Sequence, residues 1–559
     1  MTRQFPASLF VPILLAVLLA ACGVDGADPG DLGADVPEAE RYGGTVVIGT
    51  YGDLQPMNRF ISSDYNTNMI QREMLFMPLV KFDENQEPYP WLAERWDTVR
   101  VAPDSLELTF ALRRDIHWHD GEPTTARDVA FTYERLQDPR TGFPNPAYFE
   151  YYHPRAELLD DYTIRFRLRA HAEFLEPWFM TPAMPRHLLE SAAPSEMLNH
   201  RFGTQEPVGN GPFRFVRRTP GQEWVFEANP DFPEALGGRP YLDRVAVRYI
   251  PEQTTLLTET LTGRIDFYMG PNPEHAARIE AARDVELRDF TFRQWVYIAW
   301  NTRLPQFRDA RVRRALTMAI DRQQIVDGLV YGYGHIGRGT ITPGHWAYDA
   351  DDPETLLPYD PAAARRLLAE AGWTPGPDGT LRNAAGEPFR FTLITNHGNE
   401  TRKDILDYVQ AQLRPLGIEV QPRLVEWTTM LDQLRGTLNS EGVREREFDA
   451  VVSSWVDAIR KDDADQIHSR ALNLPYQYVG YSHPTADRYL DTVAVLMNRE
   501  EARPFWREYE RFIVQEAPYT VLYFPQRLAA VRTRVRDIEM DDRGEFINIT
   551  RWWIAPGQR

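Results

Sequence analysis

The hydrophobic positions of the chain switch repeatedly between the spacing of a helix and that of a strand. In QTTLLTETLTGRIDFYM, Leu256, Leu257 and Leu261 recur at helical spacing, and Gly263 is placed to end the helix. Residues 265–269 then have the pattern of a strand. A helix, a glycine and a strand in this order indicate an α/β protein.

Capping residues mark the two clearest helices. One helix is predicted after Asp309, which can cap it, and its buried face is expected to carry Val312, Ala315, Leu316, Ala319 and Ile320. The other lies in DPAAARRLLAEAGW, where Asp360 can cap the helix, Pro361 occupies its first turn and Gly372 ends it.

Four runs predict strands of a core sheet. TVVIGT, at 45–50, is expected to be the first core strand. A complete βαβ unit has strands at 389–394 and 418–424 around a helix at about 402–416, and a further strand runs over 448–455. Such units favour a parallel sheet with right-handed crossovers.

The carboxyl ends of these strands are the predicted place for a ligand. In open α/β sheets, ligands bind in the crevice beyond this edge. Asn396, His397 and Trp455 fall there.

The N-terminal residues have the features of a targeting segment. Arg3 precedes a mostly apolar run at 9–21, which has the length of a signal peptide and is too short to cross a bilayer comfortably. LAAC, at 19–22, resembles the lipobox of bacterial lipoproteins, which implies cleavage before Cys22 and lipid modification of that residue. Residues 23–40 carry six acids and no base, so we predict an acidic flexible tether over 23–42.

Composition narrows the class of protein. Hydrophobic residues make up 43% and charged residues 26% of the 559 residues, which is typical of a globular chain. The net charge of −19 disfavours a nucleic-acid partner, because phosphate binding depends on clustered Lys and Arg. Cys22 is the only cysteine, so no intramolecular disulfide can form. The chain has no nucleophile elbow, zinc-protease motif or phosphate loop, so we expect neither catalysis nor a cofactor.

Seven segments carry a family pattern. They are PWLAERW (90–96), LTFALRRDIHWHDGEPTTARDVAFTYERL (108–136), PVGNGPFRF (207–215), GGRPYLDRVAVRYI (237–250), LTGRIDF (261–267), FRDARVRRALTMAIDRQQIV (307–326) and LLAEAGW (367–373). In this order they resemble the solute-binding proteins of ABC importers, in family five, which includes oligopeptide-, dipeptide- and nickel-binding members. The resemblance covers nearly all of the chain after the tether.

The resemblance implies a fold and its division. The expected fold is an α/β, periplasmic-binding-protein-like two-lobed clamshell with an extra domain, built of mixed sheets flanked by helices. Lobe I would comprise residues 43–62, 187–290 and 528–559, the extra domain 63–186, and lobe II 291–527. Residues 1–22 would be the lipoprotein signal peptide, with Cys22 as the first mature residue.

The stretch HWHDG raises the question of a metal site or a catalytic pair. His117 and His119 flank a tryptophan and precede Asp120-Gly121, which is a strong turn signal. Thr125 is placed to cap the following helix, and in relatives a strand ends in a turn here. We therefore predict that both histidines flank a turn. The alternative of another class is a metal-dependent hydrolase that uses His117, His119 and His153.

Trp455 and the residues after it bear on which ligand the protein binds. Trp455 coincides with a tryptophan that faces ligand in many relatives. In peptide-binding relatives, an aspartate three residues later pairs with the ligand's α-amino group. Here that position is Ala458, and Asp457 lies one place earlier. Either Asp457 replaces the amine-binding residue, or the amine anchor is absent and the ligand is not an ordinary peptide.

Further candidates come from the same resemblance. Trp295 and Tyr297 share one face of a predicted strand at the entry to lobe II, where relatives contact ligand, and burial in the lobe core is the alternative. Asp64 and Asn66 lie where lobe I of relatives meets ligand, and Tyr148 lies in an aromatic patch of the extra domain.

Two candidates lie beyond the strand at 389–394. Asn396 falls at its carboxyl end, and Arg402 begins the following helix, where it can face a ligand carboxylate. A solvated surface arginine is the alternative for Arg402.

The predicted function is to bind a peptide or peptide-like solute by lobe closure and deliver it to an ABC permease, without catalysis. The alternative within binding proteins is a non-peptide solute such as a nickel chelate or a sugar. The expected protein is monomeric, extracytoplasmic and lipid-anchored to a bacterial membrane.

Overall fold

The structure is a computed structural model that describes residues 36–559. The predicted signal peptide, Cys22 and most of the predicted tether lie outside the described residues. The last part of the predicted tether, 36–42, is packed rather than free. Tyr241 donates a hydrogen bond to Glu38 at 3.0 Å, and its ring meets Tyr42 edge-on with the centroids 5.1 Å apart. The prediction of a flexible tether to residue 42 is therefore wrong at this end, because these aromatic contacts fix the segment.

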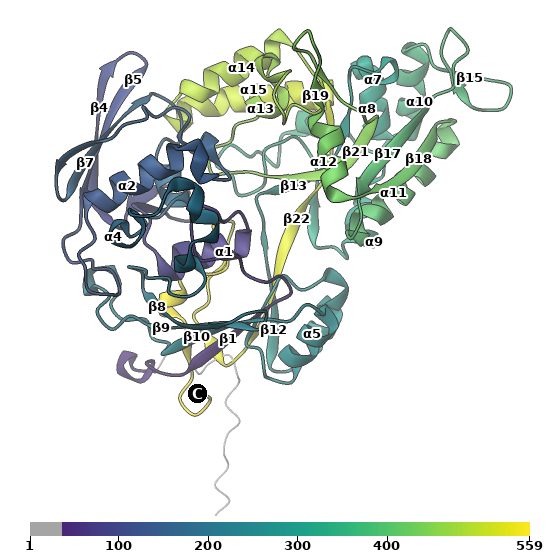
Figure 1. The fold of residues 1–559 in the computed structure, drawn as a ribbon. Helices are drawn as coiled ribbons and strands as arrows, with labels where there is room; N and C mark the ends of the chain where they lie inside the picture. The colour runs from purple at the N-terminus through teal and green to yellow at the C-terminus, as the bar shows by residue number, and fades with distance from the viewer. Residues whose placement is uncertain (1–35) are drawn as a thin grey trace, which may run out of the picture.

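One long strand joins two halves of the molecule. Within residues 36–559, twelve strands form a continuous sheet in which β22 (Tyr519–Arg532) runs from one half into the other (Figure 1). The order is β18 (Glu419–Val425), β17 (Arg390–Asn396), β21 (Ala450–Val456), β13 (Gln294–Trp300), β22, β11 (Phe267–Met269), β1 (Thr45–Thr50), β10 (Arg244–Tyr249), β9 (Glu223–Ala228) and β8 (Phe213–Thr219), with β12 (Val285–Thr291) and β14 (Gly334–Ile336) also paired to β22. We call the part around β1, β8 to β12 lobe I, and the part around β13, β17, β18 and β21 lobe II.

Lobe II has helices on both faces of its strands. Alternate residues of β13 point to opposite faces, so Val296, Ile298 and Trp300 enter one core while Trp295, Tyr297 and Ala299 enter another. The first core is closed by α8 (Ala310–Met318), α9 (Arg322–Leu329), α10 (Pro361–Glu370) and α11 (Glu400–Leu413). The second is closed by α12 (Trp427–Arg435), α14 (Pro484–Val495) and α15 (Arg499–Glu516).

Lobe I shares its main core with a smaller sheet. Val46 and Ile48 of β1 enter a core that also contains residues of β5 (Ser105–Leu112), β7 (Thr163–Arg169) and α2 (Ala126–Gln137). Val47 packs on the opposite face, against α5 (Gln253–Leu261) and α6 (Ala276–Glu280). The smaller sheet has the order β4 (Ala93–Ala102), β5 (Ser105–Leu112), β7 (Thr163–Arg169) and β6 (Glu157–Asp160). With α2 (Ala126–Gln137), α3 (Glu176–Met180) and α4 (Arg186–Leu189) it forms what we call the extra domain.

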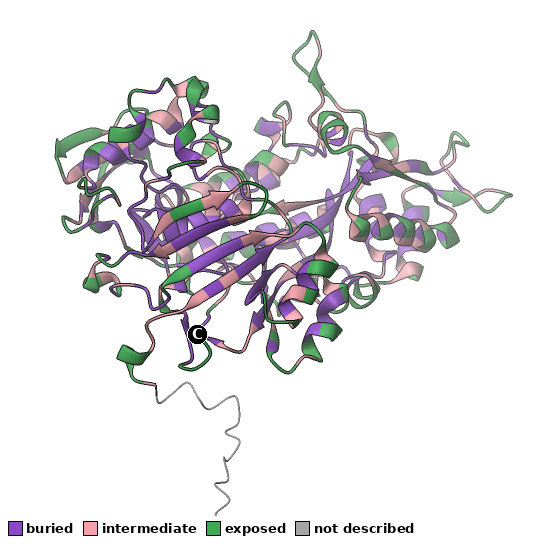
Figure 2. Cartoon of the chain, turned by 60° about the horizontal axis from the view of Figure 1, so that its bottom comes forward, coloured by how far each residue is buried: buried purple, intermediate pink, exposed green. Residues whose placement is uncertain are grey.

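Two chain segments, which lie beside each other, connect lobe I to lobe II. The chain passes from β12 to β13 through Phe292 and Arg293, and it returns along the middle of β22. Buried strands fill the centre of the molecule, and exposed residues lie on the outer faces of the helices (Figure 2). Because each lobe has its own core, these two segments form a natural hinge.

The predicted helices are confirmed by their caps. Asp309 accepts a hydrogen bond from the backbone N–H of Arg311, and Asp360 from that of Ala363, both at 2.8 Å. Gly372 follows α10 in the left-handed region, at φ +88°. The predicted βαβ unit is also confirmed, since β17 and β18 are parallel neighbours. The sheet as a whole is mixed, because β13 and β22 run antiparallel to their neighbours.

The turn predicted in HWHDG is confirmed. The backbone N–H of Gly121 donates to the carbonyl oxygen of Trp118 at 2.8 Å, and Gly121 has φ +97°. Thr125 caps α2 in a capping box with Asp128.

Candidate functional site

A polar cluster lies at the carboxyl end of the lobe II strands, where the sequence places Asn396 and Arg402. The guanidinium of Arg402 donates to Oδ1 of Asn396 at 3.0 Å and to Oγ of Ser454 at 2.6 Å. Gln294, at the start of β13, donates to the same Ser454 hydroxyl at 2.8 Å. The loop after β17 and the strands β13 and β21 therefore meet at one point.

Arg402 has neutral hydrogen-bond partners and no ion pair within residues 36–559. Burial lowers the pKa of its guanidinium, and the electrostatic influence of the neutral Tyr297 and Tyr523 hydroxyls opposes this shift only in part. A partly buried cation without a carboxylate is suited to an anionic ligand group, because burying an unpaired charge is costly.

Aromatic rings line the site beside this cluster. Trp455 stacks on Tyr478, with centroids 5.3 Å apart and an interplanar angle of 20°, and on Tyr297 at 6.3 Å and 25°. Tyr476 meets Trp455 edge-on at 6.0 Å and is itself exposed. Trp455 is half-buried, so it presents part of its ring outward, as a ligand-facing residue requires.

Trp295 and Tyr297 lie beneath this surface. Both side chains are only 1% exposed and pack in the second core of lobe II. In the described conformation they support Trp455 and Asp457: Tyr297 stacks against Trp455, and the indole N–H of Trp295 donates to Oδ1 of Asp457 at 3.1 Å.

Asp457 follows β21 and is held from two sides. Besides the bond from Trp295, its Oδ2 accepts from the ammonium group of Lys461 at 2.9 Å. The backbone N–H of Asp457 donates to the carbonyl oxygen of Arg293, in the hinge, at 2.7 Å. Asp457 is therefore tied to the hinge and to a buried lysine.

The lobe I candidates lie around β22. Asn66 accepts a hydrogen bond from Arg527 at 2.9 Å, and the same guanidinium lies over the ring of Tyr65, 4.4 Å from its centroid. Arg527 also pairs with the fully buried Glu545. Asp64 caps α1 (Tyr65–Ile70), where it accepts from the backbone N–H and the hydroxyl of Thr67. Its carboxylate is thus engaged in a structural role.

Tyr148 lies in the extra domain, within electrostatic reach of Glu176. Burial raises the pKa of its hydroxyl, and Arg59, Glu176 and Arg293 are among the charged groups that act on it. Glu176 in turn accepts hydrogen bonds from the backbone N–H groups of Ile459 and Arg460, at 2.6 and 2.9 Å. Ile459 belongs to lobe II but is fully buried in the core shared by lobe I and the extra domain.

The structure therefore brings six of the nine predicted residues into one cluster, which comprises Trp295, Tyr297, Asn396, Arg402, Trp455 and Asp457. Asn66 and Asp64 lie on lobe I, and Tyr148 lies on the extra domain.

Comparison with known proteins identifies the family. A family model described as Bacterial extracellular solute-binding proteins, family 5 Middle, matches residues 87–469. The oligopeptide-binding protein AppA of Bacillus subtilis (strain 168) is 30% identical over 554 residues, which is 98% of each chain. The chain belongs to the family 5 bacterial extracellular solute-binding proteins.

Solved structures of other binding proteins share the fold. The structure of Bacillus subtilis AppA in complex with a nonapeptide matches with a TM-score of 0.75 and 29% identity, and covers 92% of this chain and 100% of that one. The substrate-binding protein CtaP of Listeria monocytogenes matches with a TM-score of 0.78 at 22% identity, over 92% and 100% of the two chains. The predicted two-lobed α/β fold is confirmed. A relative with another name also matches: heme-binding protein A of Haemophilus influenzae is 25% identical to this chain over 504 residues, 85% of each chain.

Four residues in or near the carboxyl edge of the lobe II strands were not predicted from the sequence. Trp427 begins α12 directly after β18 and is 48% exposed, and Tyr476 adds a second exposed ring. Trp427 could have been predicted as a ligand-binding candidate, because it follows the carboxyl end of the predicted strand at 418–424. Ser454 and Lys461 had none, because their partners come from distant parts of the chain.

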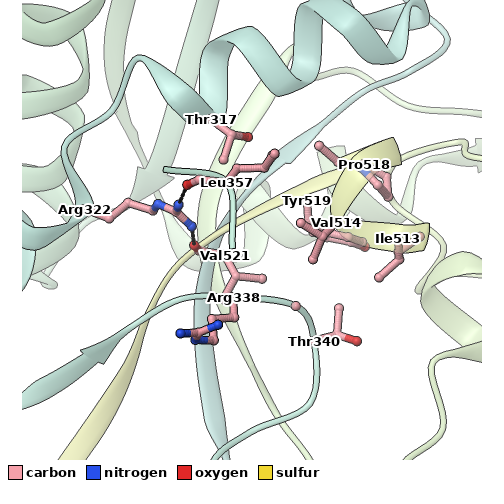
Figure 3. A pocket seen from close by; sticks show the side chains of 12 residues that line it. Thr317, Arg322, Arg338, Thr340, Leu357, Ile513, Val514, Pro518, Tyr519 and Val521 are labelled. Carbon is pink, nitrogen blue, oxygen red and sulfur yellow. Dashed lines mark hydrogen bonds between the residues drawn. The ribbon is translucent and has the colours of Figure 1, made fainter. Parts of the chain in front are cut away.

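Two hollows lie apart from this cluster. The first, inside lobe II, holds about 20 Å³, enough for roughly one water molecule. Figure 3 shows Arg322 on its wall, where it donates to the carbonyl oxygens of Leu357 and Val521. The second holds about 690 Å³ between the extra domain and lobe II, and Trp96, Trp346 and Arg499 are among its lining residues.

His119 of HWHDG has a structural partner. Nε2 of His119 lies 2.9 Å from the carbonyl oxygen of Gly211, and burial lowers the pKa of the ring to about 4. Across residues 36–559, no group of three or more His, Cys, Asp or Glu side chains is arranged to hold a metal ion. In the same part of the chain, no helix has the length and apolarity needed to cross a membrane.

Proposed function

We propose that this family 5 member is the substrate-binding component of an ABC importer and that it captures a peptide or peptide-like solute between its lobes. The observation that carries the proposal lies at the carboxyl edge of the lobe II strands. There the guanidinium of Arg402 has neutral hydrogen-bond partners and no carboxylate partner within residues 36–559, and the half-buried ring of Trp455 follows one of these partners, Ser454, in the chain. Similarity over 98% of the length of an oligopeptide-binding protein supports the same ligand class.

Lobe closure is the proposed mechanism. A ligand that touches both lobes only in the closed form shifts the population toward closure by its difference in affinity for the two states. The hinge at Phe292 and Arg293 and in β22 allows this rotation, because each lobe has a core of its own and Ile459 is the buried lobe II residue that reaches into the core of lobe I and the extra domain. The permease then distinguishes closed from open protein, and the binding component performs no catalysis.

Main-chain hydrogen bonds would give affinity for an extended peptide with little dependence on sequence. In this scheme Arg402 binds an anionic group, the Trp427, Trp455 and Tyr476 rings pack against side chains or backbone, and Asn66 contributes from lobe I. Trp295, Tyr297 and Asp457 shape the floor beneath Trp455, Tyr148 contributes from the extra domain, and Asp64 orders α1.

The proposed location is extracytoplasmic. Residues 1–22 would be removed as a signal peptide, and lipid on Cys22 would anchor a monomer to a bacterial membrane, where more than one acyl chain makes attachment lasting.

The test combines native mass spectrometry with thermal unfolding. Native spectra of the purified protein should reveal co-purified peptides, and peptide pools should raise the melting temperature, because a ligand selective for the folded state stabilises it. Small-angle scattering should report a smaller radius of gyration with peptide. A melting temperature that responds only to nickel chelates, heme or sugars would contradict the peptide assignment.

A further inference from the structure

A buried lysine lies between two carboxylates directly after β21. The ammonium group of Lys461 is 2.9 Å from Oδ2 of Asp457 and 2.7 Å from Oδ1 of Asp463. The side chains of Lys461 and Asp463 are each 2% exposed, and that of Asp457 is 15% exposed. Solvent and solutes therefore reach Asp457 at its edge only.

Both carboxylate oxygens of Asp457 already have a donor. Oδ1 accepts from the indole N–H of Trp295 at 3.1 Å, and Oδ2 accepts from Lys461. The ammonium group also lies over the ring of Trp295, 5.4 Å from its centroid. Burial lowers the pKa of Lys461, but Asp457 and Asp463 outweigh it, and the net shift is upward. Lys461 is thus charged and fixed against Asp457.

The lysine is held in place from its other side as well. Asp463 accepts hydrogen bonds from the hydroxyls of Thr340, at 2.5 Å, and Tyr509, at 2.8 Å. Release of Lys461 from Asp457 would leave a buried carboxylate without its cation, which is strongly destabilising. An ammonium group arriving from solvent cannot easily displace it.

The charges around Trp455 are therefore asymmetric. Arg402 has only neutral hydrogen-bond partners, whereas the carboxylate nearest to Trp455 in the chain, Asp457, has its own cation. The site offers a free positive charge but no free negative charge at this point. A ligand must therefore supply a negative charge at Arg402, but it need not supply a positive charge at Asp457.

We propose that Lys461 is a specificity-determining residue that stands in for a ligand ammonium group, so that the site accepts peptides and peptide-like solutes whose amino terminus is blocked. This inference rests on the proposed peptide function. Acyl, formyl and cyclised amino termini remove the charge that a free α-amino group would bring, and Asp457 is already neutralised without it.

The test uses two randomised nonapeptide pools that lack lysine and differ only in the amino terminus, which is free in one and acetylated in the other. The apparent affinity of each pool is read from the concentration that gives half of the maximal rise in melting temperature. For the unmodified protein, we expect the two affinities to agree within about threefold, since no anion at the site awaits the amine.

Variants of the same loop sharpen the test. Lys461→Met leaves Asp457 without its cation and should create a preference of about tenfold or more for free amino termini. The double variant Lys461→Met, Asp457→Asn should lose that preference. Asp465→Asn is the matched control, because Asp465 is exposed in α13 (Ala464–Ile467), directly after this loop, and it should leave the ratio unchanged.

The outcomes separate this inference from the proposed function. A tenfold preference of the unmodified protein for free amino termini overturns the role of Lys461 while peptide binding stands. If neither pool binds, both the peptide function and this inference are overturned. If Lys461→Met does not fold, the ratio measured on the unmodified protein still decides.

Discussion

Arg499 and Glu173 form a two-point ion pair that connects lobe II to the extra domain. Nε of Arg499 lies 2.7 Å from Oε1 of Glu173, and Nη2 lies 3.0 Å from Oε2. The same guanidinium reaches Glu87 at 3.0 Å and the backbone carbonyl oxygen of Asn85 at 3.1 Å. Both partners of the ion pair are mostly buried, at 15% and 12% exposed side-chain area. Paired carboxylate and guanidinium planes of this kind are stronger than exposed ion pairs.

Breaking this ion pair should destabilise the closed state and thereby weaken ligand binding. Glu173→Gln keeps the shape of the side chain but removes its charge, and a charge-assisted hydrogen bond contributes about 1.5 to 3 kcal/mol. We expect peptide affinity to fall about tenfold, measured by calorimetry, with a larger radius of gyration in scattering. Glu508→Gln, on the exposed face of α15, is the control. Equal affinities of Glu173→Gln and the unmodified protein would exclude a role for the ion pair in closure.

Arg402 should recognise a carboxylate of the ligand. Replacement by Met removes a cation whose partners in the protein are neutral, so stability should change little while affinity falls about 10- to 100-fold. The check is a comparison of peptides with a free and an amidated carboxyl terminus. The unmodified protein should prefer the free acid, and Arg402→Met should bind both equally. A preference that survives in Arg402→Met would place the anion site elsewhere.

Trp427 should contribute to binding but not to folding. Its side chain is 48% exposed at the carboxyl edge of the lobe II strands, so truncation to Ala removes ring surface without opening a core. Aromatic contacts at binding surfaces often contribute more than 1 kcal/mol, so peptide affinity should fall about tenfold. Tyr359 is equally exposed but hydrogen-bonds to Gln412 of α11, and Tyr359→Ala serves as the control. Matching losses in the two variants would argue against a specific contact.

Glu510 should make stability depend on pH. Burial raises the pKa of its carboxyl group to about 7, the charge of Asp463 adds to the shift, and Lys461 opposes it. Because the folded state binds this proton more tightly than the unfolded state, the contribution is complete below about pH 4.5 and is lost as the pH rises through 7. The loss amounts to about 3 kcal/mol at most.

Urea unfolding at pH 5 and pH 8 checks this sign. The free energy of unfolding of the unmodified protein should fall relative to that of Glu510→Gln between the two pH values, because the variant has no proton to lose. Glu510 accepts from the backbone N–H of Thr340 at 2.9 Å, and a glutamine oxygen can keep that bond. A pH-independent difference between the two proteins would mean that Glu510 keeps its ordinary pKa.

The local rules of the chain determined the helices and strands that were predicted. Asp309 and Asp360 begin helices because a side-chain oxygen can satisfy free N–H groups at a helix start, and Gly372 ends one because a glycine tolerates positive φ. The turn at Asp120-Gly121 follows from the same kind of rule. These interactions span a few residues, so they can be recognised without knowledge of the fold.

The sequence by itself determined the α/β pattern and, through its motifs, the family and the edge of the sheet where Arg402 and Trp455 lie. Only the tertiary structure decided that Trp295 and Tyr297 are buried, that residues 36–42 pack on Tyr241, and that Lys461 neutralises Asp457. It also decided that Glu173 meets Arg499, more than 300 positions later in the chain. Burial and charge pairing depend on which distant segments meet, and that is set by the packing of the whole chain rather than by local spacing.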